Sequence, residues 1–324
     1  MATQSHYAGT APAQRQGSQT LKWAALAALL ALALVAPFQL YPVFLAKALC
    51  FALFACAFNL LIGYVGLLSF GHAAFFGSAA YVTAHAVKVW GLTPEFGILL
   101  GVATAAGFGL LFGIIAIRRQ GIYFAMVTLA LSQMVFFLAL QLKFTGGEDG
   151  IQAVPRGHLF GIFDLGNNLT MYYFVLAVFL AGFALIHRTI HSPFGQVLKA
   201  IRENEPRAVS LGYKVDQYKL TAFVMSAALA GLAGGTKAIV FQLASLTDIT
   251  WQMSGEVVLM TLLGGLGTIF GPVVGAFLVV TLQNYLAGTQ LPVTVVTGVI
   301  FVVCVLLFRR GIVGEIGALL KAKT

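Results

Sequence analysis

Charged residues are scarce in this chain, and their scarcity excludes an ordinary soluble domain. Asp, Glu, Lys and Arg make up 9% of the sequence, whereas hydrophobic residues make up 60% and the mean hydropathy is +0.93. Soluble domains carry about 25% charged residues, so this composition cannot build a water-exposed surface of normal size. Successive apolar runs of membrane-spanning length instead predict an all-α, polytopic membrane protein.

Cysteine is also rare, and the residue patterns of metal binding and catalysis are missing. The three cysteines lie inside apolar runs, with no CxxC spacing and no His at ligand spacing, which predicts buried small hydrophobes rather than a disulfide or a metal site. No Ser/His/Asp, Cys/His or paired-carboxylate constellation supports catalysis, so we expect no enzyme activity and no cofactor in this chain alone. The cysteines are Cys50, Cys56 and Cys304.

The apolar runs define about eight to ten candidate transmembrane helices, each close to the length that crosses a bilayer. A cleaved signal peptide is the alternative for the first run, but Pro37 and the closely following second run favour a spanning helix. Residues 1–20 are polar and predict a disordered tail. The runs are Leu21–Leu40, Val43–Ile62, Leu67–Val87, Phe96–Ile117, Ile122–Leu142, Met171–Ile186, Leu220–Phe241, Val257–Leu286 and Pro292–Phe308.

The positions of the basic residues predict the orientation of these spans. Most of the basic residues cluster in four places, whereas the loop at 143–170 carries more acidic than basic residues. Because cytoplasmic loops retain positive charge, we expect both termini and the segment 187–219 inside and the loop 143–170 outside. The same rule explains the net charge of +9 without nucleic-acid binding. The four places are Arg15 with Lys22, Arg118 with Arg119, the segment 187–219, and the C-terminal Arg309, Arg310, Lys321 and Lys323, of which the last two lie in a tail at 311–324.

The run Val257–Leu286 is too long for one span. As a continuous helix it would measure about 45 Å, whereas the hydrocarbon core is about 30 Å thick. Its middle is rich in glycine, so it cannot continue as a plain helix and we expect two pieces that meet at a bend. The count is then ten spans, or eight with a re-entrant hairpin. The residues expected at the bend, as packing or pathway positions, are Gly264, Gly265, Gly267, Gly271 and Pro272.

The segment Ser192–Lys219 is a charged, helix-patterned insert in an otherwise apolar chain. Ser192-Pro193 is a helix start, and apolar residues from Phe194 to Ile201 recur at the spacing of one helix face. Pro206 is expected to interrupt this helix, and a second short helix should end at Gly212. Two short helices on the cytoplasmic side of a membrane protein predict a docking surface for a soluble partner.

Two further glycine-rich stretches have alternative interpretations. The stretch 59–77 holds small residues three or four apart, including Gly71 and Gly77, which lets helices approach closely; its His72 is a packing residue or, less favoured, a proton carrier. The stretch 145–150 resembles a cation loop without its ligand spacing, so a turn shaping the outer mouth is favoured. The residues that we expect to form this turn are Gly146, Gly147, Glu148 and Asp149.

Two isolated charges in the spans also have two interpretations. Lys237 and Glu256 lie near the outer ends of their spans, where they could pair with each other. Separate snorkelling of each side chain to the lipid headgroups is the favoured explanation.

These motifs, taken together and in this order, resemble the LivM-type permease subunits of branched-chain amino-acid ABC importers. The resemblance covers about residues 40–310 and is carried by NLLIGYVGLLSFGHAAFFG (59–77), TGGEDG (145–150), SPFGQVLKAIRENEPRAVSLGY (192–213), YKLTAFVMSAALAGLAGG (218–235) and LLGGLGTIFGPVVGA (262–276). In such permeases a cytoplasmic loop with an alanine four residues before a glycine inserts into an ATPase. The resemblance carries this role to Glu205, Pro206, Arg207, Ala208 and Gly212, where Pro206 and Arg207 depart from the strict family triplet.

The resemblance also implies partners and a substrate. It implies a second, similar permease subunit, two cytoplasmic ABC ATPases that bind ATP and Mg, a periplasmic binding protein and a location in the bacterial inner membrane. The implied substrates are leucine, isoleucine and valine, with urea or short amides as the alternative within the family. A stand-alone secondary transporter or channel is the alternative from another class, and few residues in the spans could couple transport to an ion.

Overall fold

The computed structural model describes residues 31–161, 163–288, 295–296, 298–299, 302–303, 306 and 311–315. The chain forms two units, Met1–Pro42 and Val43–Thr324. Within the first unit, residues 31–39 are helical. The predicted tail at 1–20, Cys304, the Arg309-Arg310 pair and the last nine residues lie outside the described part, and the run Pro292–Phe308 is described only at scattered positions.

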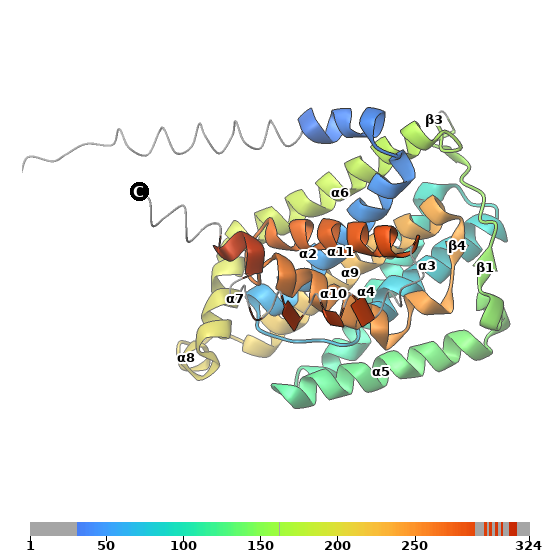
Figure 1. The fold of residues 1–324 in the computed structure, drawn as a ribbon. Helices are drawn as coiled ribbons and strands as arrows, with labels where there is room; N and C mark the ends of the chain where they lie inside the picture. Colours follow the sequence, from blue (N-terminus) through green and yellow to red (C-terminus); the bar gives the residue numbers. More distant parts are fainter. Residues whose placement is uncertain are drawn as a thin grey trace, which may run out of the picture. The chain divides into compact units, whose positions relative to one another are not determined.

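The second unit is a helical bundle, which confirms the predicted all-α class (Figure 1). Among the described residues, five helices are long and apolar enough to cross a membrane. They are α2 (Pro42–Tyr64), α4 (Pro94–Ala116), α5 (Ile122–Gln141), α6 (Asn168–His191) and α9 (Val215–Phe241). The shorter α3 (His72–Lys88) packs between them, chiefly against α4 and α9.

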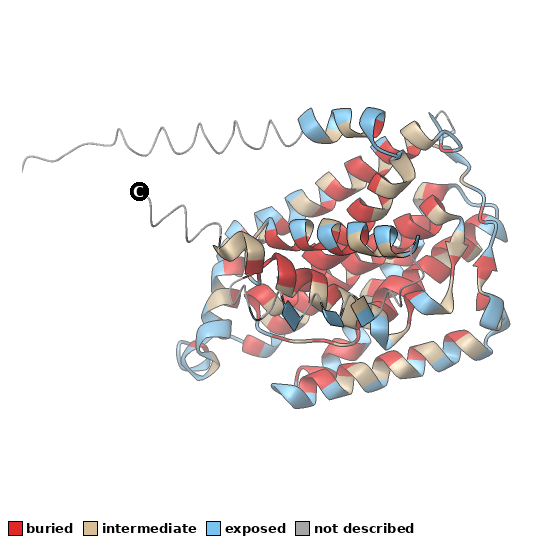
Figure 2. Ribbon diagram, in the orientation of Figure 1, coloured by how far each residue is buried: buried red, intermediate tan, exposed pale blue. Residues whose placement is uncertain are grey.

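The centre of this bundle is formed by α2, α3 and α9. The most apolar stretch of α2 is 89% buried and that of α9 is 78% buried, against 33% to 39% in α4, α5 and α6, whose exposed sides suit lipid (Figure 2). Small residues allow the close packing at the centre: a methyl group added at Gly234 of α9 would collide with the Phe76 carbonyl oxygen of α3. Without a hydrophobic driving force between helices in lipid, such close backbone contacts are the main source of packing energy.

The elements between the long helices gather at two ends. The loop end carries two 3-10 turns, η1 (Lys143–Thr145) and η2 (Gly147–Asp149), followed by β1 (Ile151–Gln152), β2 (His158–Leu159) and β3 (Phe163–Asp164). Strand β1 pairs antiparallel with β4 (Leu243–Ala244), which precedes η3 (Leu246–Asp248), and β2 pairs with β3. The insert end carries α7 (Pro193–Glu203) and α8 (Glu205–Ser210), which connect α6 to α9.

The long glycine-rich run splits into two helices, as predicted. Helix α10 (Trp251–Gly264) and helix α11 (Gly271–Leu286) have 14 and 16 residues. Each is about 21 to 24 Å long, shorter than the hydrocarbon core. They pack antiparallel, since Gly264 lies against Gly271 and Gly275 lies against the Met260 carbonyl oxygen.

Several predicted boundaries differ from the structure. The span predicted from Leu67 begins only at His72, because Val65 to Gly71 is not helical. Helix α6 continues through His191 and α9 begins at Val215, so both ends of the predicted 187–219 insert extend the long helices. The loop predicted at 143–170 contains short strands, and its last three residues already belong to α6.

Candidate functional site

The insert folds as two capped helices. The Ser192 hydroxyl accepts a hydrogen bond from the Gly195 amide, and Pro193 lies in the first turn of α7. Asn204 ends α7 and starts α8, because its side chain accepts a hydrogen bond from the Arg207 amide at 3.0 Å. Pro206 therefore lies inside the first turn of α8, where a missing N–H costs nothing, and the predicted interruption at Pro206 is in fact made by Asn204. Gly212 follows α8 with a positive φ of 87°.

Two residues assigned to ATPase coupling fix α8 to the rest of the protein instead of facing outward. Ala208 is 2% exposed and packs with Ile201 of α7 and Val215 of α9. Glu205 forms an ion pair with Lys219 of α9 at 2.6 Å, and the Lys219 side chain is almost fully buried. These contacts make α7, α8 and the start of α9 one packed unit.

The outward side of α8 is exposed and largely apolar. Val209 is 56% exposed and Leu211 is 69% exposed, next to the exposed Pro206 and Arg207. We call these four residues the α8 face. The α8 face thus presents two exposed apolar side chains, Val209 and Leu211, beside a helix that is anchored from its other side.

Helix α7 also contacts the end of α2. The Arg202 guanidinium donates a hydrogen bond to the Gly63 carbonyl oxygen, and the Lys199 ammonium lies 5.8 Å from the centre of the Tyr64 ring. Gly63 and Tyr64 are in the last turn of α2, where the free carbonyls and the helix dipole favour positive charge.

The bend between α10 and α11 lies at this same end. Asn59 of α2 donates a hydrogen bond to the Thr268 carbonyl oxygen at 2.9 Å and accepts one from the Gly267 amide at 3.0 Å. Gly311 lies against Gly265. The bend therefore packs against the last turns of α2, next to the insert.

The glycines predicted at the bend have separate structural reasons. Gly265 and Gly267 have φ values of 120° and 72°, which favour glycine, and a side chain on Gly264 would meet the Gly271 backbone. The Gly271 amide donates to the Thr268 hydroxyl at 3.1 Å, and Pro272 lies in the first turn of α11.

The start of α3 lies inside the bundle, and its backbone is satisfied by hydroxyl groups from distant segments. The Phe70 amide donates to the Thr128 hydroxyl at 3.1 Å, and the Ala73 amide donates to the Ser254 hydroxyl at 3.0 Å. Gly71 sits close to the Thr128 carbonyl oxygen, and Gly77 lies against the Asp248 backbone.

His72 is fully buried next to this start. Its Nε2 lies 2.8 Å from the Ser226 hydroxyl, which in turn donates to the Ala57 carbonyl oxygen at 2.5 Å. The rings of Phe58, Phe75 and Phe223 meet the imidazole edge to face. These contacts join α2, α3 and α9 around the imidazole.

The glycine-rich loop forms a tight turn with exposed carboxylates. Gly146 and Gly147 have φ values of 79° and 62°, while Glu148 and Asp149 are exposed. Within the described part of the chain, no group of His, Cys, Asp or Glu side chains is placed to hold a metal.

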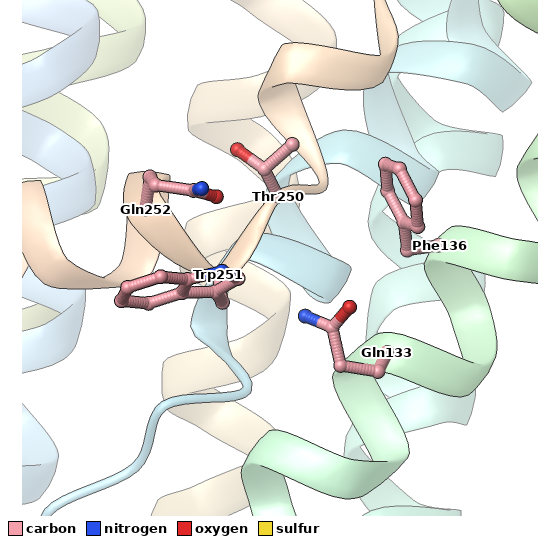
Figure 3. A pocket seen from close by; sticks show the side chains of 5 residues that line it. All are labelled: Gln133, Phe136, Thr250, Trp251 and Gln252. Carbon is pink, nitrogen blue, oxygen red and sulfur yellow. The ribbon is translucent and has the colours of Figure 1, made fainter.

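A small cavity of about 170 Å³ opens between α5 and the start of α10. Gln133, Phe136, Thr250, Trp251 and Gln252 line it (Figure 3). Its lining is neutral, so it offers no ionic partner to the carboxylate or ammonium of an amino acid.

The contacts of Lys237 contradict both predictions made for it, pairing with Glu256 and snorkelling to the headgroups. It neither pairs with Glu256 nor snorkels to the surface, because its ammonium group binds both carboxylate oxygens of Asp248 at 2.7 and 2.6 Å, with both side chains nearly buried. Asp248 also accepts a hydrogen bond from the Ser245 amide. The ion pair fixes the end of α9 to η3.

Sequence reasoning missed the polar side chains that join the helices to one another and to the breaks. Asn59, Thr128, Ser226 and Ser254 each lie inside an apolar helix and bond to another segment. Their only signal in the sequence is a polar residue within an apolar run, which does not identify its partner.

A bundle of apolar helices of membrane-spanning length is the architecture of a multi-pass membrane protein. Residues 40–308 match the family described as branched-chain amino acid transport system / permease component. The chain belongs to this family, which confirms the resemblance seen in its motifs.

Permeases that are named for different substrates match the chain. LivM, the high-affinity branched-chain amino acid transport system permease protein of Escherichia coli, is 30% identical over 250 residues, which are 68% of this chain and 58% of LivM. The ribose import permease protein RbsC of Bacillus subtilis is 29% identical over 56% of this chain and 58% of its own length. The autoinducer 2 import system permease protein LsrC of Klebsiella pneumoniae is 28% identical over 51% of this chain and 49% of its own. The chain thus spans about 58% of the length of LivM. No solved structure matches it.

Breaking the buried ion pair should destabilise the protein. Lys237→Met leaves the Asp248 carboxylate buried without a cation, and we expect a loss of about 3–5 kcal/mol in the free energy of unfolding, measured by denaturation in detergent. The double variant Lys237→Met/Asp248→Asn removes the stranded charge and should recover most of this loss. Equal stability of the wild type and the single variant would contradict the structural role of the pair.

Proposed function

We propose that this chain is the membrane permease subunit of an ATP-driven importer of branched-chain amino acids. The α8 face carries the proposal, because it offers an exposed apolar surface on a helix that is anchored to the spans through Ala208 and Glu205. The proposed occupant of this face is an ABC ATPase, which would bind the ATP and Mg. A second, similar permease, a second ATPase and a periplasmic binding protein complete the proposed complex.

Leucine, isoleucine and valine are the proposed substrates. The LivM relatives support this choice, since they match more of the chain than the ribose and autoinducer 2 permeases do. Urea or a short amide, the alternative that the family resemblance implies, is the second candidate.

We further propose the bacterial inner membrane as the location, with both termini and the insert end in the cytoplasm. The basic pair Arg118-Arg119 supports this orientation. It follows α4, whose Gly113 packs against Leu220 near the start of α9, and therefore lies at the same end as the insert. The exposed carboxylates of Glu148 and Asp149 lie at the other end.

Disruption of the α8 face should uncouple the permease from its ATPase. Leu211→Asp places a charge in the proposed apolar contact and should weaken ATPase binding by on the order of 2 kcal/mol, a roughly 30-fold loss. ATP-dependent leucine uptake into proteoliposomes of the full complex should fall with it. Leu211→Met, which keeps the position apolar, is the matched control. Normal ATPase binding and normal leucine uptake by the complex with Leu211→Asp would contradict the proposed docking role.

The orientation can be tested with single cysteines in a cysteine-free background. Glu203→Cys at the insert end and Glu148→Cys at the loop end are both exposed positions. In intact cells, a membrane-impermeant maleimide should label only the cysteine at 148, and the cysteine at 203 should react only after the membrane is opened. Labelling of the cysteine at 203 in intact cells would reverse the assignment.

A further inference from the structure

We propose that Arg202 is a positioning residue that transmits movement of the insert to the bend between α10 and α11. The proposal rests on the proposed function, because the movement would come from an ATPase bound to the α8 face. It adds a defined route: from α8 through α7 to the end of α2, and from there to the bend.

The first step of the route is the rigidity of the insert itself. Helices α7 and α8 are joined by the single residue Asn204, which caps both, and they share the cluster of Ile201, Ala208 and Val215. A displacement of α8 therefore carries α7 with it, because no flexible linker separates the two helices.

The second step is the contact of Arg202 with two backbone segments. Its guanidinium donates to the Gly63 carbonyl oxygen of α2, and its Nη1 lies 3.2 Å from where a side chain on Gly267 would begin. The contact with Gly63 is a hydrogen bond, whereas the contact with the Gly267 backbone is a close van der Waals approach.

The third step joins α2 to the bend through Asn59. Its amide donates to the Thr268 carbonyl oxygen and accepts from the Gly267 amide, so two hydrogen bonds fix both partners. A side chain on Gly63 would collide with Asn59 and lie 2.9 Å from the Gly267 nitrogen. The approach of α2, α7 and the bend thus depends on the absence of side chains at Gly63 and Gly267.

The contrasting explanation is that Arg202 only caps α2 and keeps the insert folded. The two explanations differ in what its removal does. Loss of a structural cap lowers assembly, ATP hydrolysis and transport together. Loss of a transmitting contact leaves the ATPase bound and active while transport per ATP falls.

The test uses the full complex in proteoliposomes, with leucine as the transported probe. ATPase co-purification, ATP hydrolysis and leucine uptake are measured for Arg202→Gln, which removes the guanidinium from its contact with α2. Glu203→Gln is the control, because it removes a charge from the neighbouring exposed position. We expect normal co-purification and near-normal basal hydrolysis for Arg202→Gln, with about a tenfold drop in leucine imported per ATP, within the usual range of coupling energies.

The three measurements separate a transmitting contact from a structural cap. Transport per ATP that stays at the wild-type level in Arg202→Gln overturns the proposal, and so does a parallel fall of co-purification, hydrolysis and uptake. Should Arg202→Gln fail to accumulate in the membrane, Arg202→Lys replaces it, since lysine keeps the cation but lacks the planar set of donors and should show the same loss more weakly. A wild-type complex without ATPase would instead refute the proposed function, and this result is visible before any variant is made.

Discussion

The structure depends on one constraint: backbone that leaves a helix inside the bundle must find hydrogen-bond partners within the protein. Lipid supplies none, and each unsatisfied group costs several kcal/mol. The chain leaves its helices twice in the described core, between α2 and α3 and between α10 and α11. At both places, side chains from other segments satisfy the backbone. Thr128 and Ser254 form hydrogen bonds with the backbone at the first break, and Asn59 does so at the second.

This constraint explains why the breaks also tie the bundle together. The partners come from α5, α10 and α2, so each hydrogen bond joins elements that are far apart in the sequence. The glycines at the second break permit the required φ values and the close approach of backbones. Closely packed backbone and shared hydrogen bonds mean that the bend and the end of α2 cannot move independently, and the Arg202 contact brings the insert into the same unit.

Much of this fold could be predicted from local sequence. Apolar runs located the spans, glycine density located the split between α10 and α11, and Ser192-Pro193 with Gly212 marked the helix ends in the insert. The remaining features depend on contacts that local sequence does not encode. The late start of α3 depends on hydroxyl groups more than fifty residues away, and the partner of Lys237 lies in η3 instead of a neighbouring span. Alanine at 208 matches the family pattern, but only the packed structure shows that it anchors α8 rather than forming its outer face.

The roles of the residues in the insert follow from how far each side chain is buried. Buried Ala208 and Lys219 fix α8, the exposed Val209 and Leu211 are available to a partner, and Arg202 contacts the spans.

The central claim is that the backbone of the two broken segments is hydrogen-bonded and packed inside the protein. Hydrogen exchange of the purified protein tests this most directly, by comparing peptides that cover 65–74 and 265–271 with the exposed loop at 118–121. Our account predicts that the amides of both broken segments exchange slowly, close to the rates of the flanking helices. Exchange as fast as in the exposed loop would contradict it.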